Sequence, residues 1–365
     1  MKPENALREY LAQIGPLNRV LEEKAWEREM ALAKPARSLG LLEDIAVRLS
    51  SIQNSAQPRH ERKLMVVCAG DHGVWEEGVS PWPQSVTYQQ VLNFSKGGGA
   101  ITTISKSAGV KVILLDVGVN YEFPPFEDPP FSEEKIPPPR RVSRKVAFGT
   151  KNLAKGPAMS REEAVLSILA GIETVLAEPG VDLTGAGEMG IANTTPSSCI
   201  ACVYTGLSAD EATGIGSGLN EEQRQNKARV VEKALKINAP DPGDPLDVLA
   251  KVGGLELGAM CGVYLGAAIR RSGIVIDGFI GAASALIAEK LSPGITRYMF
   301  AGHKSKEKAH IKVLEHLNLR PLLDLNMCLG EGSGAAAAML ILQLSCDHFN
   351  NMRTFEESAV DHRNP

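Results

Sequence analysis

The 365-residue sequence contains no apolar run close to the roughly 20 residues that are needed to cross a bilayer. Its first residues also lack the apolar core of a signal peptide. Basic residues are not in excess, since 39 Lys and Arg stand against 43 Asp and Glu, for a net charge of −4. With this charge balance, the sequence shows no excess of positive charge that would bind nucleic acid or an anionic membrane surface. We therefore expect a cytoplasmic protein that has neither a membrane nor a nucleic acid as its partner.

Disulfide and metal chemistry have little support in the sequence. The six cysteines include one close pair, Cys199 and Cys202, and no second pair completes a zinc site. His72 has no second ligand at metal spacing, and the zinc-binding His-Glu-x-x-His pattern and the serine elbow of hydrolases are both absent. We expect reduced, buried thiols and no metal site.

Glycine, in contrast, is abundant. The chain has 35 glycines among its 365 residues, which is more than the usual share of about 7%. From residue 64 onward, short apolar segments alternate with helical patterns. The expected strands are Leu64–Cys68, Val110–Val117, Val181–Leu183, Ile274–Ile276, Arg297–Phe300 and Leu322–Leu325. This alternation predicts an α/β fold with a mostly parallel, Rossmann-like sheet and helices on both faces. Ligands in such sheets bind beyond the carboxyl ends of the strands, where the glycine-rich segments fall.

Two regions depart from the alternation. Residues 1–57 and the stretch after residue 332 have helical patterns and no strand. Residues 118–160 hold seven prolines between Pro124 and Pro139, followed by a basic cluster. Proline without periodic apolar residues predicts an irregular excursion.

The segment Gly185–Gly190 fits the dinucleotide pattern G-x-G-x-x-G, with Asp210 about twenty residues later. The residues around Asp210 do not form the second strand that the dinucleotide fold needs, so a mononucleotide or phosphate site is the better interpretation. A nucleotide-dependent oxidoreductase that uses this segment remains an alternative. We expect Glu188 in a loop before a helix that Thr195 caps and Pro196 begins. There its carboxylate could accept from a ribose hydroxyl or merely cap the helix.

A helix is predicted over Glu221–Lys236, with Asn220 and Gln223 as a capping box. Its spacing places Lys227 on the inward, apolar face. A lysine there needs an anionic partner, for which phosphate is our preferred candidate, unless the side chain extends to the helix edge.

The most informative segment surrounds Glu331, which lies between Gly330 and Gly332 after an apolar strand and before an alanine-rich helix. Glycine permits close backbone approach, and a helix start favours an anion. A lone carboxylate at such a strand end suits chemistry, and a solvated loop carboxylate is the alternative.

Six segments together resemble a known family, and they occur in the order Ala69–Val74, Glu77–Ser80, Val91–Phe94, Gly185–Ile191, Val275–Phe279 and Leu329–Gly334. Over roughly residues 60–345 the sequence resembles the nicotinate-nucleotide–dimethylbenzimidazole phosphoribosyltransferases of cobalamin lower-ligand assembly. The resemblance implies transfer of phosphoribose from nicotinate mononucleotide to dimethylbenzimidazole or a related base. The products would be α-ribazole phosphate and nicotinate, with inversion at the anomeric carbon.

The resemblance also implies a homodimer, small-molecule substrates, and neither a metal nor an organic cofactor. It implies a small helical domain built from both chain ends, which we assign to residues 1–57 and 333–365, beside a catalytic α/β domain of residues 58–332. A nucleotide-binding regulator without catalysis remains a rival hypothesis.

The same resemblance implies roles for individual residues. Glu331 falls on the general base, and a positioned carboxylate can take the proton that the attacking base must lose. The residues implied for the base pocket are Ser80, Gln89 and Leu329. The residues implied for binding the nucleotide and its phosphate are Glu188, Gly190, Lys227, Asp277 and Ser305.

Overall fold

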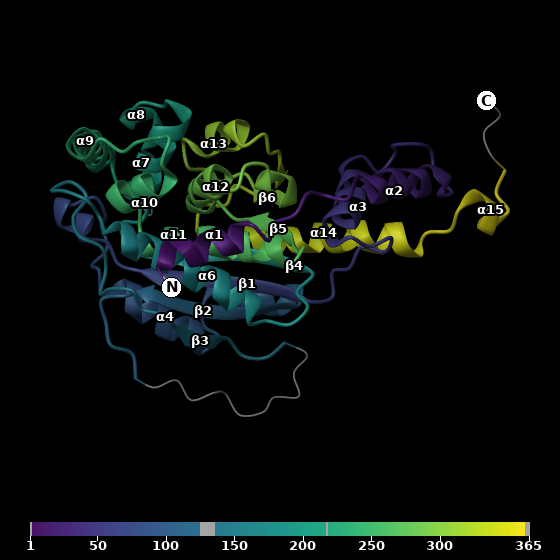
Figure 1. The fold of residues 1–365 in the computed structure, drawn as a ribbon, viewed down its shortest axis with the longest axis horizontal. Coiled ribbons are helices and arrows are strands. Elements are labelled where there is room, and N and C mark those ends of the chain that lie inside the picture. The colour runs from purple at the N-terminus through teal and green to yellow at the C-terminus, as the bar shows by residue number, and fades with distance from the viewer. Residues whose placement is uncertain (1, 125–135, 217, 362–365) are drawn as a thin grey trace.

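The computed structural model describes residues 2–124, 136–216 and 218–361, and a seven-stranded sheet forms its centre (Figure 1). The strands are β1 Lys63–Gly70, β2 Val110–Gly118, β3 Arg140–Ser143, β4 Leu183–Met189, β5 Gly273–Ile276, β6 Met299–His303 and β7 Pro321–Leu323. Their order is β3-β2-β1-β4-β5-β6-β7, and every neighbouring pair is parallel. The chain reverses its direction of travel across the sheet between β1 and β4, which is where open α/β sheets bind ligands. The predicted α/β fold is confirmed.

Strands β1 and β2 consist of nearly continuous apolar residues, and all of their residues except the half-buried Lys111 are buried. Such runs are typical of parallel strands that helices cover on both faces. Each expected strand overlaps an observed one. Strand β3 was not expected, because its residues Arg140–Ser143 are largely polar; it pairs with β2 at the sheet edge, where exposed charge is tolerated.

Helices cover both faces of the sheet. Their bounds are α1 Pro3–Leu11, α2 Arg19–Ala31, α3 Leu41–Gln53, η1 Gly73–Glu77, α4 Val86–Ser95, α5 Ala100–Ala108, α6 Arg161–Leu176, α7 Thr194–Thr205, α8 Ala209–Ala212, α9 Glu221–Asn238, α10 Pro245–Val252, α11 Leu255–Ile269, α12 Phe279–Leu291, η2 Ile295–Tyr298, α13 His310–His316, α14 Ser333–Asn351 and α15 Phe355–Ser358. Helix α11 packs on β1, β2 and β4 and against α6, which also contacts β2. Helix α14 packs with α5 and on β4, β5 and β6. No helix among the described residues is long and apolar enough to cross a membrane.

Helices α2 and α3 from the N-terminal part of the chain lie beside helix α14 from the C-terminal part, far from α8 and α9 (Figure 1). Helix α3 packs against both α2 and α14. Arg28 of α2 donates to the carbonyl of Phe349 at 3.0 Å, and Leu32 forms an isolated bridge with Thr354. Helix α1, in contrast, packs on α6 and α11. The domain boundaries at residues 57 and 332 stay a prediction.

Two local expectations were wrong and one was right. The segment Gly185–Gly190 does not form a loop, because its residues through Met189 belong to β4. Helix α7 begins at Thr194 with Asn193 as its N-cap, instead of beginning at Pro196. The capping box before α9 is confirmed, since Asn220 and Gln223 each accept from the other's backbone N–H. Most of the proline-rich stretch lies outside the described residues.

Candidate active site

Glu331 lies in the turn that joins β7 to α14. Its backbone has a φ of +64°, and those of Gly330 and Gly332 both have +93°. A residue with a Cβ atom rarely adopts this left-handed conformation, so the surrounding structure must hold it there. The half-buried carboxylate accepts through Oε2 from the backbone N–H of Ile101, in the first turn of α5, at 3.3 Å.

Strand β4 lies directly beneath this turn. A Cβ atom added at Gly187 would lie 2.1 Å from the carbonyl oxygen of Glu331, so only glycine fits. Glycine in β4 therefore permits the close approach of another backbone, as glycine within strands often does. The dinucleotide hypothesis needs these glycines in a strand-to-helix turn, and the structure contradicts that placement.

Glu188 of β4 is the second carboxyl group of the site. Its Oε1 accepts from the backbone N–H of Glu331 at 3.3 Å, and its Oε2 accepts from the side-chain amide of Asn193. The side chain is buried, and burial raises the pKa of Glu188 to about 8, against the lowering effect of its hydrogen bonds. Burial, together with the charge of Asp277, also raises the pKa of Glu331. Burial therefore disfavours the charged form of Glu188 beside Glu331, whereas the two hydrogen bonds that it accepts favour the charged form.

The third ionisable side chain of the site is Lys227 of α9, which contacts the start of α7 just after β4. It is 1% exposed, and its Nζ donates to the hydroxyl of Thr194 at 2.6 Å. Burial lowers the pKa of Lys227 to about 8, although the charge of Glu307 raises it. No ion pair involves this ammonium within the described ranges. A buried cation in this state suits an anionic ligand.

The structure connects three of the predicted site residues in one series of contacts. Glu331 contacts Glu188, Glu188 contacts Asn193, and the next residue, Thr194, contacts Lys227. Residues at the carboxyl ends of β4 and β7 and on α9 therefore form a single site.

Ser305 follows β6 and lies near this site. Its hydroxyl accepts from the N–H of Glu307 at 3.2 Å, and its own N–H donates to Nδ1 of His310 at 3.0 Å. A Cβ atom at Gly214 would lie 2.1 Å from Oε2 of the same Glu307. The loop after β6 and the glycine-rich loop before α9 therefore meet beside Lys227.

Asp277 and Gly190 have structural partners instead of open space. The Asp277 carboxylate accepts from the N–H groups of Gly332 and Ala335 at 3.2 and 2.9 Å and is 3% exposed. A Cβ atom at Gly190 would lie 2.3 Å from the carbonyl oxygen of Gly70. Gly190 therefore lets the ends of β1 and β4 pack closely.

The three residues implied for the base pocket are accessible. The Ser80 hydroxyl accepts from the N–H of Trp82 at 3.2 Å, Gln89 is exposed on α4, and Leu329 is 56% exposed. From α4, the Thr87 hydroxyl accepts from the N–H of Ile191, just beyond the end of β4, at 3.1 Å. The structure does not join Ser80 or Gln89 to Glu331 by a hydrogen bond within its described part.

Sequence reasoning missed one buried pair at the end of β1. His72 and Glu256 are both fully buried, and His72 Nε2 lies 2.8 Å from Glu256 Oε1. Burial alone would lower the pKa of His72, but the charges of Glu256, Asp71 and Glu188 raise it overall. The signal was present, since Glu256 is the one charged residue between positions 253 and 269. Among the described residues, no three acidic, histidine or cysteine side chains are arranged to hold a metal ion.

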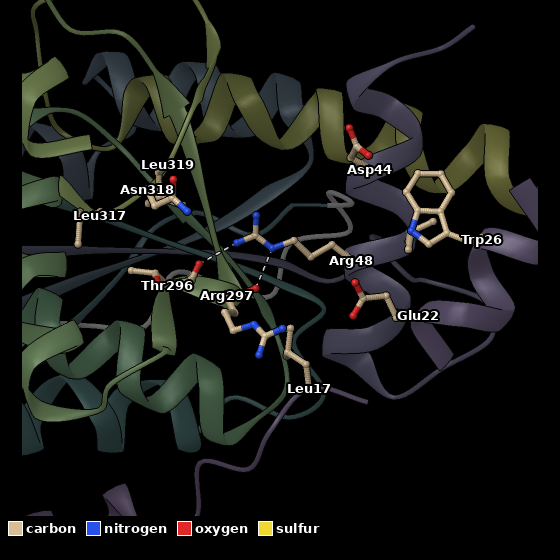
Figure 2. A pocket seen from close by; sticks show the side chains of 11 residues that line it. Leu17, Glu22, Trp26, Asp44, Arg48, Thr296, Arg297, Leu317, Asn318 and Leu319 are labelled. Carbon is tan, nitrogen blue, oxygen red and sulfur yellow. Dashed lines mark hydrogen bonds between the residues drawn. The ribbon is translucent and has the colours of Figure 1, made fainter. Parts of the chain in front are cut away.

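A separate cavity of about 350 Å³ lies where α3 meets η2 and not at the carboxyl edge of the sheet (Figure 2). Arg48 enters it from α3 and donates to the carbonyl oxygens of Arg297 and Thr296, both at 2.7 Å. Burial lowers the pKa of Arg48 to about 10. These contacts attach α3 to η2, so the cavity marks a structural junction.

This chain is similar to phosphoribosyltransferases over nearly its full length. A protein-family model described as phosphoribosyltransferase matches residues 14–360. The nicotinate-nucleotide–dimethylbenzimidazole phosphoribosyltransferase of Chloroflexus aurantiacus (strain ATCC 29366 / DSM 635 / J-10-fl) is 46% identical over 353 residues, 96% of this chain and 97% of the relative. The chain belongs to this phosphoribosyltransferase family. A family member of the same name from Desulforudis audaxviator is 46% identical over 358 residues, 98% of both chains. The crystal structure of the Thermus thermophilus phosphoribosyltransferase has a TM-score of 0.87 at 41% identity and covers 95% of this chain and 100% of its own.

Proposed function

We propose that this phosphoribosyltransferase transfers phosphoribose from nicotinate mononucleotide to dimethylbenzimidazole or a related base. Nicotinate and α-ribazole phosphate are the products, and the anomeric carbon is inverted. The observation that carries the proposal is the placement of Glu331, a half-buried carboxylate held in a left-handed turn at the carboxyl edge of the sheet. The names of the relatives supply the substrates.

The reaction requires one proton acceptor. One ring nitrogen of the base attacks the anomeric carbon while the bond from that carbon to the nicotinate nitrogen breaks, and the bonding electrons stay on nicotinate. The other ring nitrogen of the attacking base gives its proton to Glu331. Because nicotinate leaves with a neutral ring nitrogen, no strong general acid is needed. Positive charge develops on the sugar, as in glycoside cleavage.

The electrostatics suit this assignment. Burial raises the pKa of the Glu331 carboxylate and makes it a stronger base. The raised pKa of Glu188 disfavours a second negative charge beside Glu331, where an anionic nucleotide must bind. Glu188 then faces the ribose, and Lys227 and Ser305 bind the phosphate. Gly190 contributes to the nucleotide site by letting the ends of β1 and β4 pack closely beside Glu188.

The base pocket is the accessible part of the proposed site. Ser80 and Gln89 offer polar atoms, and the exposed Leu329 offers an apolar surface two residues before Glu331. An aromatic base that covers Leu329 would bury this surface. The family resemblance supports a homodimer without a metal or organic cofactor, and the free cysteines, of which only Cys328 is exposed, suit a cytoplasmic location.

Turnover of nicotinate mononucleotide with and without dimethylbenzimidazole tests the proposal. We expect nicotinate and α-ribazole phosphate to appear in equal amounts, and only with the base, when both are followed by chromatography. A folded protein that binds the nucleotide but releases no nicotinate with any base would instead support the regulator.

A further inference from the structure

Helix α14 begins directly after Glu331 and has no capping side chain of its own. Its N-cap residue is Gly332, which has no side-chain hydrogen bond to the helix. The first N–H groups of a helix have no partner within the helix and need one elsewhere. Other helices here use a local cap, such as Asp244 before α10.

The first N–H groups of α14 are instead capped by a residue that follows a different strand. Asp277 follows β5, and its two carboxylate oxygens accept from Gly332 and Ala335, at 3.2 and 2.9 Å. Gly332 is covalently next to Glu331, so this carboxylate fixes the backbone on which Glu331 stands. An acidic group at a helix N-terminus is also favoured by the helix dipole.

Strand β6 supports the same turn from behind. A Cβ atom at Gly334 would lie 2.0 Å from Cδ2 of His303, so the imidazole is packed against the first turn of α14. The His303 Nε2 atom lies 3.7 Å from Oδ1 of Asp277. Strands β5 and β6 thus determine where the Glu331 turn lies, and the left-handed φ of Glu331 needs such support.

We propose that Asp277 is a positioning residue that holds Glu331 in its working conformation by capping α14, and that it does not contact the substrate. The inference rests on the proposed function for its catalytic consequence. Asp277 is 3% exposed, and both of its oxygens already have backbone donors. A substrate hydroxyl would have to displace one of these N–H groups.

The charge of Asp277 gives the proposal a second, electrostatic readout. The ionisable groups that interact with it are His303 of β6, Glu188 of β4, Tyr264 of α11 and Glu331 itself. Its negative charge raises the pKa of Glu331, after the larger effect of burial. Removing the charge should therefore lower that pKa.

Asp277→Asn is the test variant, because asparagine keeps one acceptor oxygen and replaces the other with an NH2 donor, so that either Gly332 or Ala335 loses its acceptor. We expect kcat to fall by about 100-fold, which a displaced catalytic group can cost, while KM for nicotinate mononucleotide changes less than about twofold. The acidic limb of the kcat/KM profile should move to lower pH. This shift reports the charge of Asp277 beside Glu331, whereas the fall in kcat at a preserved KM reports the positioning of Glu331.

The matched control is Asp244→Asn. Asp244 is the local N-cap of α10, accepts through one oxygen from the N–H groups of Leu246 and Asp247 at 3.1 and 3.2 Å, and lies outside the proposed site. We expect its kcat, KM and pH profile to match those of the wild type.

A rise of about tenfold or more in KM for the nucleotide with kcat preserved would make Asp277 a substrate ligand and overturn the inference. Unchanged kinetics in Asp277→Asn would also overturn it. Amide hydrogen exchange on the wild type tests the cap without a variant, because Gly332 and Ala335 should be protected and fast exchange there would contradict the inference. Wild-type protein that releases no nicotinate would contradict the proposed function, whereas protected amides would still show the cap.

Discussion

Replacing Lys227 with methionine should stabilise the folded protein near neutral pH and weaken nucleotide binding. The Lys227 ammonium is 1% exposed and has the Thr194 hydroxyl, a neutral group, as its hydrogen-bond partner. Methionine has a similar unbranched shape and needs no partner when buried. The lysine therefore costs stability in the free protein, and binding of the phosphate would repay that cost.

The size of the effect follows from the titration of Lys227. Burial lowers its pKa from 10.5 to about 8, and each pKa unit corresponds to about 1.4 kcal/mol, so the buried charge costs about 3 kcal/mol. Loss of the Thr194 hydrogen bond offsets about 1 kcal/mol of the gain. The variant should then be more stable than the wild type by about 2 kcal/mol near pH 7.

The pH dependence has a definite sign. Because the folded-state pKa lies below the unfolded value, the folded wild type holds fewer protons than the unfolded chain between about pH 8 and about pH 10.5. Wild-type stability attributable to Lys227 rises with pH across that range. The advantage of Lys227→Met should therefore be largest below about pH 8 and shrink above it.

Urea unfolding at about pH 7 and about pH 10 measures both expectations. Lys236→Met is the matched control, since Lys236 is exposed on the same helix and its replacement should change stability by less than about 0.5 kcal/mol. Calorimetry with nicotinate mononucleotide should show at least about tenfold weaker binding for Lys227→Met alone. The reasoning is refuted if Lys227→Met is the less stable protein near pH 7, or if its advantage is equal at both pH values.

Two further substitutions test the close approach at β4 and the packing of the chain ends. Gly187→Ala should lower kcat at least about tenfold, because the added carbon would lie 2.1 Å from the Glu331 carbonyl oxygen. Gly206→Ala has no atom within 4 Å of the added carbon; its φ of +74° strains alanine and lowers stability, but kcat should be kept. Equal kcat in Gly187→Ala and Gly206→Ala would contradict the close approach at β4. Lys34→Met should destabilise the protein by about 3–5 kcal/mol in urea, because Lys34 pairs with buried Glu29 and Glu43 at 3.1 and 2.8 Å. If Lys34→Met were as stable as the wild type, the ion pairs of Lys34 with Glu29 and Glu43 would contribute nothing to the free energy of unfolding.

The parts of the site that depend on local pattern could be predicted from sequence. The Glu331 turn was evident because glycines flank a carboxylate between a strand and a helix. Lys227 could be placed on the buried face because helical periodicity fixes which residues share a face. Strands β1 and β2 were evident because buried parallel strands are continuous apolar runs.

The contacts that organise the site could not be predicted in this way. Glu188 and Asp277 reach the Glu331 turn across sequence separations of 143 and 55 residues, which no local spacing encodes. The glycines of β4 predicted a loop because glycine is usually a turn signal, whereas here it admits another backbone. Strand β3 was hidden because its polar residues lie at the sheet edge.

Comparison of Glu331→Gln with the wild type shows whether Glu331 is the general base. Glutamine can still accept the Ile101 N–H but cannot take a proton, so the turn should persist without the base. The account predicts that base-dependent release of nicotinate falls by at least about 1,000-fold while the Kd for nicotinate mononucleotide changes less than about threefold. Turnover within about tenfold of the wild type, or loss of nucleotide binding in a folded variant, would contradict the role of Glu331 as the general base.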